Sequence, residues 1–256
     1  MVDVTWGLLG PEFLPSVLSV ITQFDGPMIE FDDGPSEMKT AESTRGSSVF
    51  PLSLCTDRPD LATGSVESSN LRLDMLPANL RASSPLEIFD YIYAVLYSPA
   101  YRARYAGALS IEFPKVPATC PVWLLSKLVP LGTELRDLHL MESPKLAKPI
   151  TEFIGGRNPE VEKISWSHDT VWVDKAQTIG FQGVPEEVWN FHIGGYQVCE
   201  KWLKDRKGRT LSKDDIAHYQ KIVVALSETI RLMAEIDRVI DANGGWPGAF
   251  QTAAQA

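Results

Sequence analysis

The sequence has few cysteines and no long apolar run. Its 256 residues include three cysteines, which lie far apart at Cys55, Cys120 and Cys199. This spacing forms neither a disulfide framework nor the paired-cysteine pattern of a zinc site, and it favours a reduced, cytoplasmic setting. Proline, glycine or charge breaks every apolar stretch short of the ~20 residues that span a bilayer. Because no apolar run is that long, we expect no membrane partner, and because no lysine or arginine precedes the first apolar residues, we expect no secretory signal.

Acidic residues are unevenly distributed along the chain. Residues 1–90 hold 14 Asp and Glu against five Lys and Arg, which accounts for the whole net charge of −9. Residues 91–256 hold 19 residues of each sign. A chain-wide excess of acid would argue against a polyanionic partner, but the neutral part of the chain can still present a basic face.

We expect an α+β protein with three regions. Residues 1–83 form an acidic N-terminal segment of short strands and loops, partly packed on the main domain, with a short helix near Phe13–Phe24 and a strand at Val49–Leu54. Residues 84–242 form the main domain, which combines a mixed β-sheet, several helices and a long C-terminal helix. Residues 243–256 form a flexible tail.

The main domain begins with a helix whose start is visible in the sequence. Ser84 as the N-cap, Pro85 in the first turn and Glu87 three residues after the cap form a capping-box pattern. Alternation of aromatic and β-branched residues predicts a hairpin within Ile164–Ile179, with its turn near Asp169. We further expect helices at Ala100–Ala108, Pro121–Val129 and Tyr196–Asp205, an extended segment at Leu135–Leu140 and a chain reversal at Gly180–Gly183.

The last long helix has a seam with the spacing of a coiled coil. It begins at the S-x-x-D pattern of Ser212 to Asp215, and Gly244-Gly245 follows its end near Asp241. Apolar or aromatic residues recur at positions 216, 219, 223, 226, 230, 233, 236 and 240. Steps of three and four give a period near 3.5, and such a seam needs a partner helix in this chain or another.

Several sequence blocks occur in the order found in large bacterial restriction-modification proteins. One is PLEIFDYIYAVLYSPAYR at Pro85–Arg102, which continues to Pro117, and another is HIGGYQVCEKWLKDR at His192–Arg206, preceded by VPEEVW at Val184–Trp189. The chain therefore resembles the C-terminal target-recognition (specificity) domain of Type ISP-like single-chain restriction-modification enzymes, most closely at 85–117 and 184–219. Shorter matches lie at Phe50–Leu52, at Leu131–Leu140, and at Ile216, His218, Tyr219 and Thr229.

The resemblance implies a mixed α/β domain that recognises double-stranded DNA, in an enzyme that methylates DNA and cleaves it with ATP. This sequence departs from the full enzyme. It has no G-x-x-x-x-G-K-[ST] phosphate-binding loop and no N/D-P-P-Y/F methyltransferase tetrapeptide, because Asn158-Pro159 continues with Glu160. The resemblance thus implies the specificity part alone, without a cofactor of its own, alongside methyltransferase and helicase parts of the same system.

Six positive side chains gather within residues 201–213, against the acids Glu200 and Asp205. One interpretation is a solvated helix end that the helix dipole favours. The other is contact with DNA phosphates, where each neutralised phosphate releases counterions. The resemblance favours the second, with side chains that position the DNA without reading its sequence. This basic cluster comprises Lys201, Lys204, Arg206, Lys207, Arg209 and Lys213.

Two other places are candidates for DNA contact. The Gly-Gly-Tyr sequence at residues 194–196 forms a tight turn before a helix, and its free N–H groups could also hold a phosphate oxygen. Positive residues near position 100 are alternative contacts, with plain surface charge as the competing interpretation. The additional predicted DNA-contacting residues are Gly195, Tyr196, Arg102, Arg104 and Lys115.

No group of residues forms a coherent catalytic or metal centre. The four histidines, at 139, 168, 192 and 218, are scattered, and core or capping roles fit them better than catalysis. Paired acids at 186–187 and 214–215 lie at helix starts, where the dipole favours them. We therefore predict no catalytic residue and no metal ligand.

Two hypotheses for function follow. In the first, the chain is the sequence-specific DNA recognition module of a restriction-modification system and is non-catalytic by itself. In the second, it is a protein-interaction or regulatory domain derived from such a module, in which the acidic first 90 residues mask or replace DNA binding.

Overall fold

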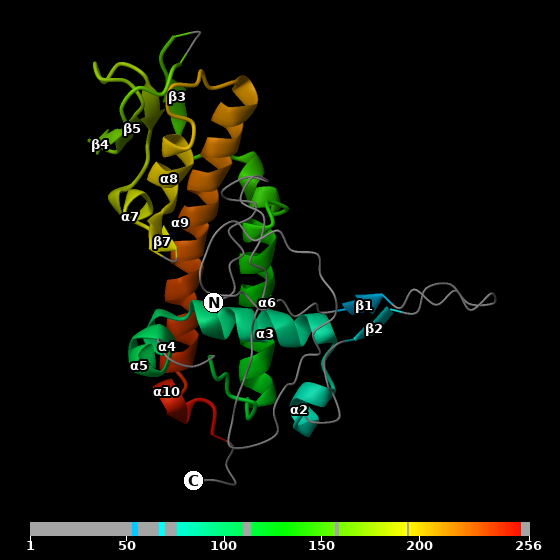
Figure 1. Ribbon diagram of the computed structural model, residues 1–256. Helices are drawn as coiled ribbons and strands as arrows, with labels where there is room; N and C mark the ends of the chain where they lie inside the picture. Colours follow the sequence, from blue (N-terminus) through cyan, green and yellow to red (C-terminus); the bar gives the residue numbers. More distant parts are fainter. Residues whose placement is uncertain are drawn as a thin grey trace, which may run out of the picture. The chain divides into compact units, whose positions relative to one another are not determined.

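The computed structural model of the chain describes residues 53–55, 67–69, 76–109, 114–156, 159–193 and 195–251 (Figure 1). Most of the predicted acidic segment, with the helix near Phe13–Phe24, lies outside these residues, and so does Phe50–Leu52. The chain divides into two compact units, which within the described part hold residues 53–136 with 232–251 (unit 1) and residues 137–231 (unit 2). No helix in the described ranges is long and apolar enough to cross a membrane.

Unit 1 is mainly helical. Its helix α3 begins with the predicted capping box, because the Ser84 hydroxyl accepts from the Glu87 N–H and the Glu87 carboxylate accepts from the Ser84 N–H at 2.7 Å. The predicted helix at Ala100–Ala108 is present as two short ones, α4 and α5. The elements are the antiparallel pair β1 (Ser53–Cys55) and β2 (Glu67–Ser69), then α2 (Ala78–Arg81), α3 (Pro85–Tyr97), α4 (Pro99–Arg104), α5 (Ala106–Leu109), most of α6 (Val122–His139), the end of α9 (Lys213–Asp241) and α10 (Gly245–Gly248).

A buried carboxylate joins α3 to α6 in unit 1. Asp90 accepts a hydrogen bond from the Thr133 hydroxyl at 2.7 Å and pairs with the Arg136 guanidinium at 2.9 Å. The two helices approach closely at Gly132, where an added Cβ would lie 1.8 Å from the Asp90 carbonyl oxygen. Only glycine fits this crossing, which accounts for the glycine at that position.

The end of α9 and the residues after it also pack in unit 1. Asp237 accepts from the Ser98 hydroxyl at 2.5 Å and from the Ala100 N–H at 3.0 Å, at the start of α4. Gly244 follows the end of α9 and has a left-handed φ of +107°. The helix therefore ends where the Gly244-Gly245 pair predicted. We expected a flexible tail at residues 243–256, but the ring of Trp246 lies 5.3 Å from that of Tyr101 and Phe250 is buried.

Unit 2 is built around a four-stranded antiparallel sheet in the order β3-β6-β5-β4. A separate hairpin, β7–β8, leads directly into helix α8. The elements are the 3-10 helix η2 (Pro144–Ala147), β3 (Glu152–Ile154), β4 (Ser165–Ser167), β5 (Thr170–Trp172), β6 (Gly180–Gln182), α7 (Glu186–Trp189), β7 (His192–Ile193), β8 (Tyr196–Gln197), α8 (Val198–Lys204) and the first part of α9.

The core of unit 2 forms where the sheet packs on α9. The ring of Tyr219 lies 4.3 Å from that of Phe181 on β6 and 5.4 Å from that of Trp202 on α8. The predicted seam of α9 is confirmed as its packing face, since none of its members is exposed. At the end of α6, His139 is fully buried and hydrogen-bonded to the Thr229 hydroxyl at 2.8 Å, a core role as predicted.

The structure confirms the α+β class, the hairpin within Ile164–Ile179 and the long C-terminal helix. Every strand pairing in the described ranges is antiparallel, so the sheet is not the mixed one that we predicted. Three local predictions were also wrong. Helix α6 continues through Pro130 to His139, so Leu135–Leu140 is not extended. Residues 180–182 form strand β6 and are not a turn, and the helix predicted from Tyr196 begins at Val198 because Tyr196 pairs with Ile193 in a hairpin.

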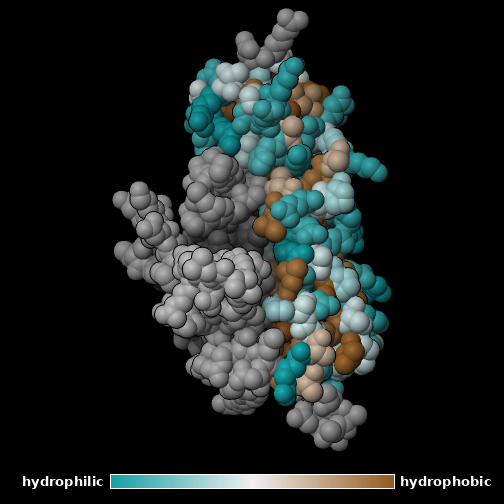
Figure 2. All heavy atoms as spheres, turned by 90° about the vertical axis from the view of Figure 1, so that its right-hand side faces the viewer, coloured by the Kyte–Doolittle hydropathy of each residue, from teal (hydrophilic) through white to brown (hydrophobic). Residues whose placement is uncertain are grey.

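Hydrophilic side chains cover most of the coloured surface in Figure 2, with hydrophobic side chains between them in small groups. Among the described residues, the exposed large apolar side chains of unit 1 are Leu86, Val122 and Trp123.

Candidate nucleic-acid interface

The basic cluster lies on α8, at the start of α9 and in the connection between them, residues 205–211, here called the basic loop. Backbone hydrogen bonds attach this loop to residues 159–161. The Gly208 N–H donates to the Val161 carbonyl at 2.8 Å, and the Val161 N–H donates to the Arg209 carbonyl at 3.0 Å. Gly208 has a φ of +77°, a conformation that favours glycine. The loop therefore has a fixed backbone from which its side chains project.

Two lysines of the cluster are paired within α8. The Lys201 ammonium lies 2.5 Å from the Asp205 carboxylate, and the Lys204 ammonium lies 2.8 Å from the Glu200 carboxylate. Each pair is four residues apart and so joins adjacent turns of the same face. The two acids offset these lysines and leave the excess positive charge to the loop.

Arg206 is engaged inside unit 2. Its guanidinium lies 3.5 Å from the centroid of the Trp202 ring, and its Nε donates to the Asp215 carboxylate at 3.2 Å. Its side chain is only 11% exposed. Asp215 also accepts from the Ser212 N–H and hydroxyl, so Arg206 links α8 to the capped start of α9. Arg206 thus holds the basic loop in place through contacts inside unit 2.

Burial and hydrogen bonding act in opposite directions on the Asp215 carboxyl. Partial burial alone would raise its pKa, but the hydrogen bonds from Ser212 and the charge of Arg206 outweigh burial and hold the pKa below its usual value. Asp215 is therefore ionised at neutral pH, as its role beside Arg206 requires.

Three cations of the cluster point into solvent. Lys207, Arg209 and Lys213 are exposed, and none has an acidic partner among the residues that the structure describes. They lie within seven positions of the sequence, Lys207 and Arg209 on the basic loop and Lys213 at the start of α9. This is the part of unit 2 best placed to meet a polyanion.

The β7–β8 hairpin places an exposed aromatic ring beside the basic cluster. Tyr196 is 58% exposed, and the Lys201 ammonium lies 5.9 Å from the centroid of its ring. Gly195 has a φ of +99° and no heavy atom near the position of a Cβ, so its backbone is open to approach. Gly194 lies outside the described residues. The structure thus brings Gly195 and Tyr196 together with the basic cluster.

The other predicted contacts belong to unit 1. The Arg102 Nε donates to the Leu96 carbonyl at 2.6 Å, and its guanidinium lies 4.8 Å from the Tyr97 ring. Arg104 lies 5.9 Å from the ring of Tyr105. The structure therefore assigns Arg102, Arg104 and Lys115 to a different unit from the basic cluster.

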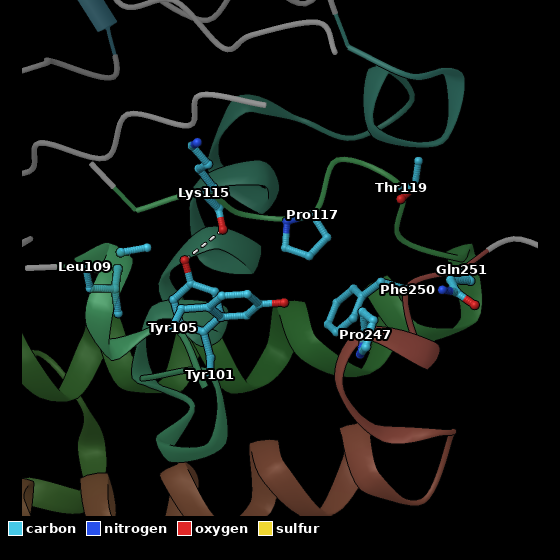
Figure 3. Close-up of a pocket in the computed structure, with 10 residues that line it drawn as sticks. Tyr101, Tyr105, Leu109, Lys115, Pro117, Thr119, Pro247, Phe250 and Gln251 are labelled. Carbon is cyan, nitrogen blue, oxygen red and sulfur yellow. Dashed lines mark hydrogen bonds between the residues drawn. The ribbon is translucent and has the colours of Figure 1, made fainter. Parts of the chain in front are cut away.

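Lys115 lies at the edge of a mostly apolar cavity of about 310 Å³ in unit 1, between Tyr105 and Phe250 (Figure 3). The Tyr101 hydroxyl donates to the Lys115 carbonyl at 2.7 Å. Burial raises the pKa of Tyr101 to about 12, so this ring is a core aromatic with a satisfied hydroxyl.

A polar surface around the β4–β5 hairpin was not predicted from the sequence. Lys163, just before β4, is exposed there, and so are Lys175 and Gln177 in the loop between β5 and β6. Lys163 is 12 positions before Lys175 in the sequence and comes near the loop because β4 pairs with β5 and the Lys163 N–H donates to the Val173 carbonyl. The predicted hairpin was the one available signal.

The described residues contain no group of three or more His, Cys, Asp or Glu side chains that could hold a metal ion. Burial raises the pKa of the Cys120 and Cys199 thiols to about 12, which makes them poor nucleophiles at neutral pH. His168 is exposed in the β4–β5 turn with a φ of +50°, so the predicted core or capping role was wrong for this histidine.

The Type ISP C-terminal specificity domain model matches residues 19–235 of the chain. A comparison with curated proteins found no match.

Two solved structures are similar in fold. The ATP-dependent Type ISP restriction-modification enzyme LlaBIII bound to DNA aligns with 72% of this chain and 13% of its own, with a TM-score of 0.53 and 21% identity. The DrdV–DNA complex solved by cryo-electron microscopy aligns with 73% of this chain and 21% of its own, with a TM-score of 0.55 and 21% identity. The chain thus spans a small part of the length of each protein.

Proposed function

The chain belongs to the family of Type ISP C-terminal specificity domains, and from this premise we propose that it recognises double-stranded DNA for a restriction-modification enzyme. A specificity domain is a recognition module and not a catalytic one. DNA is bound in both similar structures. Methylation, cleavage and ATP hydrolysis would belong to methyltransferase and helicase parts of the same cytoplasmic system.

The basic loop is the observation that carries this proposal. Its backbone is attached to residues 159–161, and it presents Lys207, Arg209 and the nearby Lys213 to solvent. Contacts to phosphates position a protein on DNA without reading sequence, and they release counterions. Two exposed cations on this loop and a third at the start of α9 suit that role.

The remaining predicted contacts divide by their surroundings. Lys204 and Tyr196 are exposed beside the loop, and with Gly195 they extend the same surface. Lys201 and Arg206 have acidic partners and are less exposed than Lys204, so we propose that they position the loop and the hairpin. Arg102, Arg104 and Lys115 stay predictions for a second contact region in unit 1.

The experiment is a mobility shift with the full chain and random-sequence duplex DNA at low and moderate salt. The variant Lys207→Glu with Arg209→Glu should bind more weakly to every sequence alike, and its salt slope should fall by about 2, because each phosphate contact contributes ~0.9. Thermal unfolding should stay unchanged, since both side chains are exposed.

The matched control is Lys148→Glu, an exposed lysine of unit 2 away from the basic loop in sequence. It should leave the salt slope unchanged. Equal binding by the double variant and the control would contradict phosphate contact by the basic loop.

A further inference from the structure

The loop between β5 and β6, residues 174–179, is held closed by one carboxylate. Asp174 is 8% exposed and accepts hydrogen bonds from the Thr178 N–H at 3.0 Å, the Thr178 hydroxyl at 2.8 Å and the Ile179 N–H at 2.9 Å. The Val173 N–H donates to the Ile179 carbonyl at 3.0 Å and closes the base of the loop. Its conformation is therefore set before any ligand arrives.

Gln177 occupies a strained position in this closed loop. Its φ is +56°, a left-handed conformation that costs a non-glycine residue free energy and that glycine would adopt without strain. The side chain is exposed, so core packing does not explain why a glutamine stands there. Strained residues that their surroundings hold in place concentrate at functional sites. The Gln177 carboxamide is therefore a candidate for contact with a ligand.

The Gln177 carboxamide is oriented and only partly used. Its Nε2 donates to the Ser165 hydroxyl on β4 at 3.3 Å. A glutamine side chain has two N–H donors and one carbonyl acceptor, so one donor and the acceptor have no partner among the described residues. In the major groove, adenine presents an N7 acceptor beside an N6 donor, and a glutamine carboxamide complements that pair.

The distance between the Gln177 loop and the basic loop also fits this role. Residues 159–163 lie between them: Val161 is hydrogen-bonded to Gly208 and Arg209 on one side, and the N–H groups of Glu162 and Lys163 donate to the Val173 carbonyl on the other. Two strand-like spacings of ~4.8 Å separate the basic loop from Val173. The resulting length of ~10 Å, from the basic loop to the base of the Gln177 loop, is comparable to the ~8.5 Å depth of the major groove, which separates phosphates from base edges.

The charges around the two loops fit the same arrangement. Glu160 and Glu162 are exposed on the intervening segment and would be repelled by phosphates, whereas Lys163 and Lys175 are exposed beside Gln177. Phosphate contact is thus disfavoured on the segment between the two loops, and Lys163 and Lys175 can hold further phosphates while the Gln177 carboxamide meets a base edge.

We infer that Gln177 is a base-reading residue, which contacts an adenine in the major groove while the basic loop holds the neighbouring phosphates. The inference rests on the proposed DNA recognition and deepens it, because it assigns sequence readout to a loop distinct from the phosphate contacts. Ser165 and Asp174 are its positioning residues.

The test is selection of the full chain against a pool of duplex DNA with a randomised centre, followed by sequencing of the bound fraction. The wild type should enrich a motif with adenine fixed at one position. Gln177→Gly removes the carboxamide and relieves the strain, so the adenine preference should fall roughly tenfold while the other positions persist. Gln182→Ala, an exposed glutamine at the far end of β6, should leave the motif unchanged.

A second measurement uses the selected duplex with 7-deazaadenine at that position, which lacks the N7 acceptor. Affinity should fall roughly fivefold for the wild type and stay unchanged for Gln177→Gly. A motif that Gln177→Gly leaves intact, weakens at all positions alike, or alters no more than Gln182→Ala would overturn the inference.

The outcomes separate this inference from the proposed function. Salt-sensitive binding without any enriched motif would overturn base reading and leave phosphate contact standing. Absence of binding by the wild type would overturn both.

Discussion

Replacing Arg206 by alanine should destabilise unit 2 more than it weakens DNA binding. The guanidinium stacks 3.5 Å from the centroid of Trp202 and pairs with Asp215 at 3.2 Å, and the side chain is mostly buried. A cation–π contact at such a site contributes ~1–2 kcal/mol, and a hydrogen bond to a charged group contributes ~1.5 kcal/mol. We therefore expect the free energy of unfolding to fall by about 2–3 kcal/mol.

Urea unfolding followed by tryptophan fluorescence measures this loss. Arg206→Lys is the matched control, because it keeps the charge but loses the planar group that stacks on Trp202, and it should give an intermediate loss. If Arg206→Ala cost less than ~0.5 kcal/mol but reduced DNA affinity tenfold, Arg206 would be a phosphate contact and its proposed role within the loop would be wrong.

Three further predictions concern Asp90 and Gly132 in unit 1 and Asp215 in unit 2. Asp90→Ala should cost about 3 kcal/mol in thermal or urea unfolding, because it leaves Arg136 without its buried partner; a loss below ~1 kcal/mol would show that the pair contributes little. Gly132→Ala should cost more than ~2 kcal/mol, since its Cβ would overlap the Asp90 carbonyl and force α3 and α6 apart; a wild-type melting temperature would contradict this close approach. The pKa of Asp215 is lowered in the fold, so its contribution to stability is present at neutral pH and is lost as the pH falls below ~4. The difference in unfolding free energy between wild type and Asp215→Asn should therefore shrink between pH 7 and pH 3, and a constant difference would contradict the assignment.

Local patterns in the sequence predicted those elements whose signals are local. The Ser84–Glu87 capping box, the α9 seam and the β4–β5 hairpin follow from hydrogen-bonding chemistry and from periodicity over a few residues. The predicted helix ended at Val129, just before Pro130, because proline lacks a backbone donor and usually ends a helix. The helix continues because buried leucines on both sides of Pro130 keep helical spacing, with Leu124 and Leu128 before it and Leu135 and Leu138 after it.

The candidate site was predictable only in part for the same reason. The basic cluster is contiguous in the sequence, so its position was visible, although the burial of Arg206 under Trp202 was not. Gln177 carries no charge and lies in a segment without a motif. Its relevance depends on the Asp174 hydrogen bonds, on its left-handed φ and on pairing between strands, none of which can be read from residue types alone.

The most direct test of DNA recognition is a salt titration of the wild-type full chain by fluorescence anisotropy with a labelled random-sequence duplex. The exposed cations Lys207, Arg209 and Lys213 predict binding whose log K falls with log salt at a slope of about −3, because each phosphate contact contributes ~0.9. Absence of binding at low salt, or an affinity that does not change with salt, would contradict recognition of DNA through this loop and would favour a protein-interaction role instead.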